Sequence, residues 1–266
     1  MKQKTETKAA AFNHSPVVYA VGLGPGARDL LTPRAEEILK SCTVIAGYST
    51  YLKLFPDLLE GKKIIESGMT HEIDRCKAAL EAALEGEKTA VISSGDAGIY
   101  GMAGLLLELT EIPRYASVDI QIIPGITACI AGAALAGAPL MNDFCCISLS
   151  DLMIPQEKIL KRVQSAACGD FVTALYNPGR QGRLAMMTHA IRIFRESAGK
   201  NLPVLVLHDI GRINELVHLS DLDHFPYSEI NMTTLIIIGN SDTLVRNGRF
   251  YCKRGYPIEK QETFSV

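Results

Sequence analysis

The chain has 266 residues, of which 47% are hydrophobic and 21% charged, and its net charge at pH 7 is −2. This length predicts one large domain or two small ones, with a sizeable core. The near-neutral charge, the absence of Trp and the few aromatic residues argue against nucleic acid or an anionic membrane surface as a partner.

The seven cysteines are an odd number and form no CxxC pair. Cys145 and Cys146 lie in an apolar run, which indicates reduced, buried thiols in a cytoplasmic protein and no metal site of zinc type. Residues 1–16 are polar and lack the apolar stretch of a signal peptide, so we expect a loose tail. The apolar run 126–141 contains glycines, alanines and a proline, which favours a buried helix over a membrane span.

The first half of the chain alternates strand and helix patterns. Apolar runs predict strands at 17–21, 43–46, 62–66, 89–92 and 118–123. Thr32 and Pro33 are typical of a helix N-cap and first turn. Helical spacing predicts a helix over 72–85 that ends at Gly86. This alternation predicts a largely parallel sheet covered on both faces.

The loop 94–101 (SGDAGIYG) follows the predicted strand 89–92, and we expect a helix to begin near Ile99. In open α/β sheets, ligands bind outside the carboxyl ends of the strands, and small residues let a ligand approach the backbone. Asp96 lies in the middle of this loop. We favour a ligand-facing role for it, and the alternative is an Asx-turn that only caps the loop.

Residues 22–26 (GLGPG) follow the first predicted strand, as a tight turn or a ligand-facing loop. They do not make a dinucleotide fingerprint. Gly26 comes one position too early, and the second strand ends in Gly47 and Tyr48 without an acid. A phosphate loop is also excluded, because no Gly-Lys-Ser/Thr occurs there.

A domain boundary is expected near Pro124, where a helix rich in alanine and glycine begins. Its small residues allow close packing against either a neighbouring element or a ligand. The second half alternates again, with predicted strands at 144–149, 171–175, 204–207 and 235–238 and helices at 155–166 and 186–194. The predicted organisation is therefore a tail (1–16), an N-terminal α/β domain (17–123), a C-terminal α/β domain (124–256) and a polar tail (257–266).

Four motifs together resemble the tetrapyrrole (corrin and sirohaem) methyltransferases, over about residues 17–256. They are 22–26 (GLGPG), 94–101 (SGDAGIYG), 124–128 (PGITA) and 231–234 (NMTT). Further motifs, at 47–51, 148–152, 175–178 and 254–256, are similar to the branch of that family that methylates C17 of corrin precursors in cobalamin biosynthesis. The resemblance implies C17 methylation with ring contraction of precorrin-3B or cobalt-factor III.

The resemblance also implies an α/β fold of two domains, with mostly parallel or mixed sheets and an active-site cleft between them, in a homodimer. S-adenosylmethionine is the implied co-substrate, and cobalt is expected only within the substrate. Pro25 is expected at the base of the cleft. The implied donor contacts are Gly95, Asp96, Ala97, Ile99, Tyr100, Thr127, Ala128, Tyr176, Asn177 and Gly211, with Thr233 near the adenine.

The substrate of such an enzyme carries carboxylates, which arginine forks suit. The loop arginines are Arg28, Arg180, Arg183 and Arg212, and we expect the group rather than one member to bind. Ring contraction needs proton transfers and stabilisation of oxygen charge. Candidates for that step are His208, because histidine titrates near neutral pH, and Tyr48, Asp151, Ser150 and Tyr176.

Two stretches depart from the expected pattern. The segment after Pro178 is short and weakly basic, and 208–212 (HDIGR) replaces the usual Ala-Gly-Arg. Both stretches are expected on the substrate side of the site, so these differences affect the prediction of the substrate more than the prediction of donor binding. The alternatives are methylation of another carbon or of a protein side chain, a nicotinamide-dependent oxidoreductase, and a tetrapyrrole carrier without catalysis.

Overall fold

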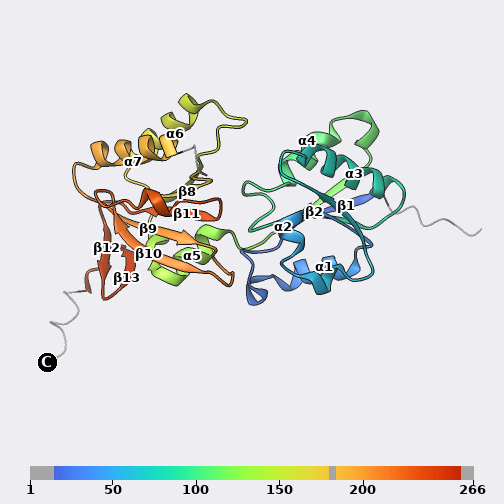
Figure 1. Ribbon diagram of the computed structural model, residues 1–266, viewed down its shortest axis with the longest axis horizontal. Coiled ribbons are helices and arrows are strands. Elements are labelled where there is room, and N and C mark those ends of the chain that lie inside the picture. Colours follow the sequence, from blue (N-terminus) through green and yellow to red (C-terminus); the bar gives the residue numbers. More distant parts are fainter. Residues whose placement is uncertain (1–14, 180–183, 259–266) are drawn as a thin grey trace, which may run out of the picture. The chain divides into compact units, whose positions relative to one another are not determined.

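The computed structural model describes residues 15–179 and 184–258, which form two compact units (Figure 1). The first unit contains the described residues up to Gly22 together with Thr32–Gly125, and the second contains Leu23–Leu31 and the described residues from Ile126 onward. The helices are α1 (Pro33–Ser41), α2 (Ser49–Leu52), α3 (Glu72–Leu84), α4 (Ala103–Thr110), α5 (Ala128–Ala136), α6 (Gln156–Cys168) and α7 (Leu184–Ala198). The strands are β1 (Val17–Gly22), β2 (Val44–Tyr48), β3 (Lys63–Ser67), β4 (Thr89–Ser93), β5 (Asp119–Ile123), β6 (Gly137–Ala138), β7 (Phe144–Ser148), β8 (Val172–Tyr176), β9 (Pro203–His208), β10 (Leu216–Asp221), β11 (Thr234–Ile238), β12 (Thr243–Arg246) and β13 (Arg249–Cys252).

The first unit is built on a parallel sheet of five strands in the order β3-β2-β4-β1-β5. Helices α3 and α4 cover one face, and α1 lies on the other (Figure 1). Val18, Val91, Leu80 and Leu106 share one core cluster under α3 and α4. The predicted parallel sheet of the first half is confirmed.

Local signals place the helix ends where the sequence predicts them. Thr32 Oγ1 accepts a hydrogen bond from the Ala35 N–H (3.1 Å), and Pro33 occupies the first turn of α1. Gly86, just past α3, has a φ of +93°, a backbone conformation that costs glycine little.

The second unit has a mixed sheet in the order β10-β9-β11-β8-β7. Only β7 and β8 pair in parallel, and the other neighbours are antiparallel. Helices α6 and α7 pack on one face, and α5 and β13 pack on the other (Figure 1). A small third sheet, β12-β13-β6, is also mixed, so the expectation of parallel or mixed sheets is met by one parallel sheet and two mixed sheets.

Three features differ from the expected elements. Helix α4 begins at Ala103 rather than near Ile99, because Tyr100 has a left-handed φ of +57° that a helix cannot contain. Strands β6, β10, β12 and β13 were not predicted. Leu23–Leu31 belongs to the second unit, although these residues lie within the sequence range expected for the first domain.

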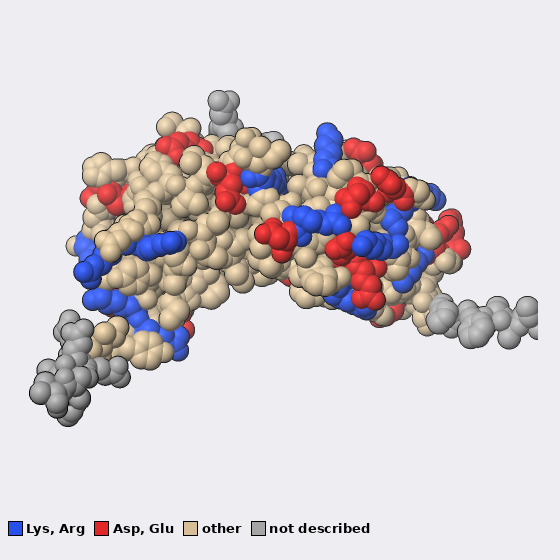
Figure 2. Space-filling view, turned by 90° about the horizontal axis from the view of Figure 1, so that it is seen from below, with Lys and Arg blue, Asp and Glu red and all other residues tan. Residues whose placement is uncertain are grey.

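The surface carries both signs of charge. Figure 2 shows acidic and basic side chains interspersed over the first unit, with basic side chains gathered where the described chain ends. Arg246, Lys253 and Arg254 line one pocket beside β12 and β13. Within the described residues, no helix is both long enough and apolar enough to cross a membrane.

Candidate active site

Three glycines meet at the carboxyl edge of the parallel sheet, where β4, β1 and β5 end side by side. A Cβ atom on Gly125 would overlap the carbonyl oxygen of Gly95 and lie 2.7 Å from the carbonyl carbon of Gly22. A Cβ atom on Gly22 would lie 2.7 Å from the Gly125 nitrogen. The three main chains therefore touch, and this glycine junction has no room for a side chain.

Asp96 fastens the loop after β4 with both carboxylate oxygens. Oδ1 accepts hydrogen bonds from the N–H groups of Gly98 (2.8 Å) and Ile99 (3.1 Å), and Oδ2 accepts one from the Gly125 N–H (2.9 Å). The carboxylate thus caps its own loop, as the Asx-turn alternative predicts, and it also ties that loop to the segment after β5.

The rest of this loop is ordered by its main chain. The Ala97 carbonyl accepts the Ala103 N–H (3.0 Å), and Ser93 Oγ accepts the Met102 N–H (3.1 Å). Ile99 and Tyr100 are 40% and 50% exposed, so the loop presents two apolar side chains on a fixed backbone.

Tyr48 lies at the end of β2, at the same edge of the first sheet. Its ring packs edge-on against Tyr51, with the ring centroids 5.3 Å apart. The first unit therefore holds Tyr48 and the five donor candidates of the 94–101 loop, which are Gly95, Asp96, Ala97, Ile99 and Tyr100.

The topology of the second sheet brings another group of candidates to one edge. Because β8 and β9 both run antiparallel to β11, their carboxyl ends lie beside its start. Tyr176 ends β8, His208 ends β9, and Thr234 is paired with His208 in register. Asn177, Gly211 and Thr233 lie within three residues of these strand ends.

Tyr176 caps helix α5. Its hydroxyl lies 2.6 Å from Thr127 Oγ1 and accepts a hydrogen bond from the Cys129 N–H (3.1 Å). Thr127, the N-cap residue, makes no side-chain bond to the helix, so the phenol takes that role. Burial raises the pKa of Tyr176, and a hydrogen bond from Cys146 lowers the pKa of Cys129 to about 7. The donor candidates Thr127, Ala128 and Tyr176 therefore lie together at the start of α5.

Asn177 adopts a left-handed φ of +51°, and its Nδ2 donates to Ser148 Oγ (3.0 Å) at the end of β7. Ser148 Oγ also accepts the Ser150 N–H (3.3 Å). Asp151 is half-buried, and its Oδ2 accepts a hydrogen bond from Gln156 at the start of α6 (2.8 Å). Asn177 is therefore tied to the loop that carries Asp151.

Pro25 packs against the loop after β9, within the second unit. Gly211 has a φ of +72°, and a Cβ atom there would lie 2.9 Å from Pro25 Cγ. The Arg212 Nε donates to the Pro25 carbonyl (3.2 Å), and an Arg212 Nη1 lies 4.0 Å from Asp209 Oδ1. Arg28 begins a short 3₁₀ turn in the same unit, and Arg180 and Arg183 lie outside the described residues.

His208 is 7% exposed and belongs to a polar cluster that the sequence did not indicate. Its Nδ1 lies 3.0 Å from Thr234 Oγ1, and its Nε2 lies 3.8 Å from Glu229 Oε2. The same glutamate oxygen lies 2.8 Å from His218 Nδ1. The alternating pattern of 217–220 could have placed His218 on a strand, but no local signal pairs Glu229 with either histidine.

Thr233 is held in a turn before β11, where its N–H and hydroxyl donate to Asn231 Oδ1 (2.9 and 2.8 Å). Among the residues that the structure describes, no group of three or more His, Cys, Asp or Glu side chains could hold a metal ion.

Comparison with known proteins identifies the family of this chain. Residues 17–226 match the tetrapyrrole (corrin/porphyrin) methylases. The chain belongs to this family. It is 43% identical to a probable cobalt-factor III C(17)-methyltransferase of Salmonella typhimurium, over 91% of this chain and 100% of that protein. It is 35% identical to a precorrin-3B C(17)-methyltransferase of Sinorhizobium, over 86% and 90%.

A solved structure is similar over the same length. The crystal structure of the methyltransferase CobJ superposes with a TM-score of 0.85 and 36% identity, covering 90% of this chain and 100% of CobJ. The fold of this chain is therefore the fold of this methylase family.

Proposed function

We propose that this protein transfers a methyl group from S-adenosylmethionine to C17 of a corrin precursor and contracts the macrocycle, in cobalamin biosynthesis. The observation that carries the proposal is the 43% identity, over nearly the whole length of both chains, to a relative named for that activity. We favour cobalt-factor III over precorrin-3B as the substrate, because the relative with 43% identity is named for cobalt-factor III.

Loops of both units are the proposed donor contacts. In the first unit these are Gly95, Asp96, Ala97, Ile99 and Tyr100, and in the second they are Pro25, Thr127, Ala128, Tyr176, Asn177, Gly211 and Thr233. The donor supplies a methyl group that is bonded to a positively charged sulfur. When the substrate attacks this methyl carbon, the sulfur leaves as a neutral thioether, so the displacement itself needs no strong acid or base. Positioning is then the main requirement, and it can lower a barrier by roughly 7–11 kcal/mol.

Rigid main chain suits that requirement. The close contact of the three main chains at the glycine junction fixes the loops after β1, β4 and β5, and the exposed side chains of Ile99 and Tyr100 offer contact surface to a ligand. Besides contacting the donor, Asp96 and Tyr176 are proposed to hold their loops in place, because their polar atoms bind backbone N–H groups.

The ring-contraction step is proposed to use His208, Tyr48 and Asp151 for proton transfer and oxygen stabilisation. His208 has a hydrogen-bonding partner for one ring nitrogen, Thr234, and a carboxylate near the other, Glu229. Arg28 and Arg212 are the described candidates for substrate carboxylates. We also propose a cytoplasmic homodimer, in which the seven free cysteines fit a reducing compartment.

The decisive experiment is thermal unfolding with S-adenosylhomocysteine, and with NAD and ATP as controls. A ligand at a hundred times its Kd adds about 2.7 kcal/mol to the free energy of unfolding, so a clear rise in Tm is expected with S-adenosylhomocysteine alone. Asp96→Ala should lose most of this rise, because the loop loses three hydrogen bonds. Asp119→Ala, at an exposed strand position of the same unit, is the matched control.

Mass spectrometry of reactions with cobalt-factor III and with precorrin-3B then identifies the substrate by the gain of one methyl group. A Tm rise with NAD and none with S-adenosylhomocysteine would contradict the proposal. Binding of a tetrapyrrole without methyl transfer would favour the carrier instead.

A further inference from the structure

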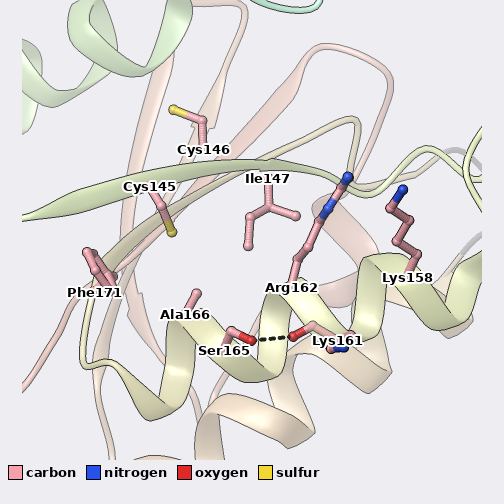
Figure 3. A pocket seen from close by; sticks show the side chains of 9 residues that line it. All are labelled: Cys145, Cys146, Ile147, Lys158, Lys161, Arg162, Ser165, Ala166 and Phe171. Carbon is pink, nitrogen blue, oxygen red and sulfur yellow. Dashed lines mark hydrogen bonds between the residues drawn. The ribbon is translucent and has the colours of Figure 1, made fainter.

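A pocket of about 590 Å³ lies between strand β7 and helix α6 of the second unit (Figure 3). Strand β7 is the last strand of its sheet, so the pocket opens beside an unpaired edge. Its volume is within the range of small-molecule sites, roughly 300–1,000 Å³. None of the residues proposed above for the donor or for catalysis lines it.

The inner wall of this pocket is apolar. Figure 3 shows Cys145 and Ile147 pointing from β7 toward α6, whereas Cys146 points to the opposite face of the sheet, as alternation along a strand requires. Ala166 on α6 and the half-exposed ring of Phe171 complete the apolar wall. Burial raises the pKa of Cys145, so its thiol stays neutral and adds no negative charge.

The rim of the pocket is cationic. Lys158, Lys161 and Arg162 come from one side of α6, at the three- and four-residue spacing that places side chains together. Figure 3 shows Lys158 and Arg162 extending from the helix toward the strand. Among the lining residues that the structure describes, none is acidic.

Within the described residues, Lys158, Lys161 and Arg162 form no ion pairs, in contrast to the arginines of α7. On α7, Arg192 lies 3.8 Å from Glu196 and Arg195 lies 3.0 Å from Asp223. No carboxylate in the described parts of the chain lies within ion-pair distance of Lys158, Lys161 or Arg162. Their positive charge is therefore available to a ligand beside an apolar wall.

We propose that the pocket between β7 and α6 binds an organic anion that has an apolar body and at least one carboxylate, phosphate or sulfonate group. The apolar body packs on Ile147, Ala166 and Phe171, and the anionic group pairs with Arg162 and the two lysines. Binding at this site uses none of the residues proposed for the donor or for catalysis.

The test is a fluorescence titration of the full chain with 8-anilinonaphthalene-1-sulfonate, an aromatic sulfonate, in the presence of saturating S-adenosylhomocysteine. The double variant Lys158→Gln/Arg162→Gln should bind the probe at least about tenfold more weakly, a loss of about 1.4 kcal/mol. The matched control Arg192→Gln/Lys200→Gln removes two exposed cations elsewhere in the same unit and should bind like the unaltered protein. Ser165→Trp, which fills the pocket without changing charge, should also weaken binding.

N-phenyl-1-naphthylamine, the same ring system without the sulfonate, separates the two parts of the ligand. The proposal expects it to bind more weakly than the sulfonate and to be indifferent to the double variant. Unchanged affinity for the sulfonate in both the double variant and Ser165→Trp would overturn the proposal. The Tm rise with S-adenosylhomocysteine should persist in all these variants, so the two proposals fail independently.

Discussion

At the scale of single residues, one hydroxyl group satisfies two buried partners. Tyr176→Phe removes the oxygen that bonds Thr127 and the Cys129 N–H, and Thr127 is only 3% exposed. Leaving such groups unpaired costs about 1–3 kcal/mol. We expect chemical denaturation to show a loss of that size, with a weaker response to S-adenosylhomocysteine.

Tyr251→Phe serves as the control, because its hydroxyl makes no hydrogen bond within the described residues. It should change the free energy of unfolding by far less. Equal losses in the two variants would show that the phenol of Tyr176 does not cap α5.

Residue types in this chain are easier to predict than their partners. The position of Asp96 in a small-residue loop pointed to a special role, but its partner Gly125 lies 29 residues away. The chemistry of histidine makes His208 a candidate from sequence alone, whereas its neighbour Glu229 comes from a later turn with no pattern of its own. Partners of this kind depend on the tertiary fold, which local sequence does not specify.

At the scale of elements, the glycine junction makes three loops depend on one another. Gly125→Ala would place a methyl group against the main chains of Gly95 and Gly22, which have no side chain to rotate away. Overpacking of this kind costs typically about 1–3 kcal/mol, and more where only backbone can yield. Both Tm and S-adenosylhomocysteine binding should fall.

Gly104→Ala is the matched control. Gly104 is the second residue of α4, and a Cβ atom there would meet nothing within 4 Å, so alanine should raise stability, by at most roughly 0.5–1 kcal/mol. The same chemical change should therefore have opposite signs at the two glycines. A neutral result for Gly125→Ala would mean that the strand ends can separate.

Strong local patterns located most elements. The apolar runs of β1, β4 and β11 and the Thr32 cap of α1 are visible in the sequence alone. Strand β10 is harder to predict, because only three of its six residues are apolar and its alternation of apolar and polar residues covers only 217–220. The sequence predicts the start of α4 too early, because the left-handed conformation of Tyr100 has no sequence signature.

At the scale of the whole molecule, buried thiols make stability depend on alkaline pH. Burial raises the pKa of Cys42 and Cys76 to about 11, against about 9 for an ordinary thiol. Below pH 9 both thiols are protonated in the native and unfolded chains, so their contribution is fully present. Between pH 9 and 11 only the unfolded chain releases these protons, and the free energy of unfolding falls by roughly 2–3 kcal/mol for each thiol.

Denaturant titrations from pH 7 to 11 check this expectation. Cys42→Ala/Cys76→Ala should flatten the alkaline decline, while Cys168→Ala, at an exposed position, should leave it unchanged. An identical decline in all three proteins would assign it to other groups.

Each unit is built from two separate segments of the chain, and this affects how the units can be produced separately. The chain passes between units at Gly22, at Leu31 and again at Gly125, so no single cut yields two intact pieces. A fragment ending at Gly125 would carry Leu23 and Leu31, both buried in the full chain, without most of the residues that cover them. The remaining fragment would lack nine residues of its own unit, from Leu23 to Leu31. To produce the second unit with all of its residues, the gene must be rearranged so that the segment Leu23–Leu31 is joined to the segment that begins at Ile126.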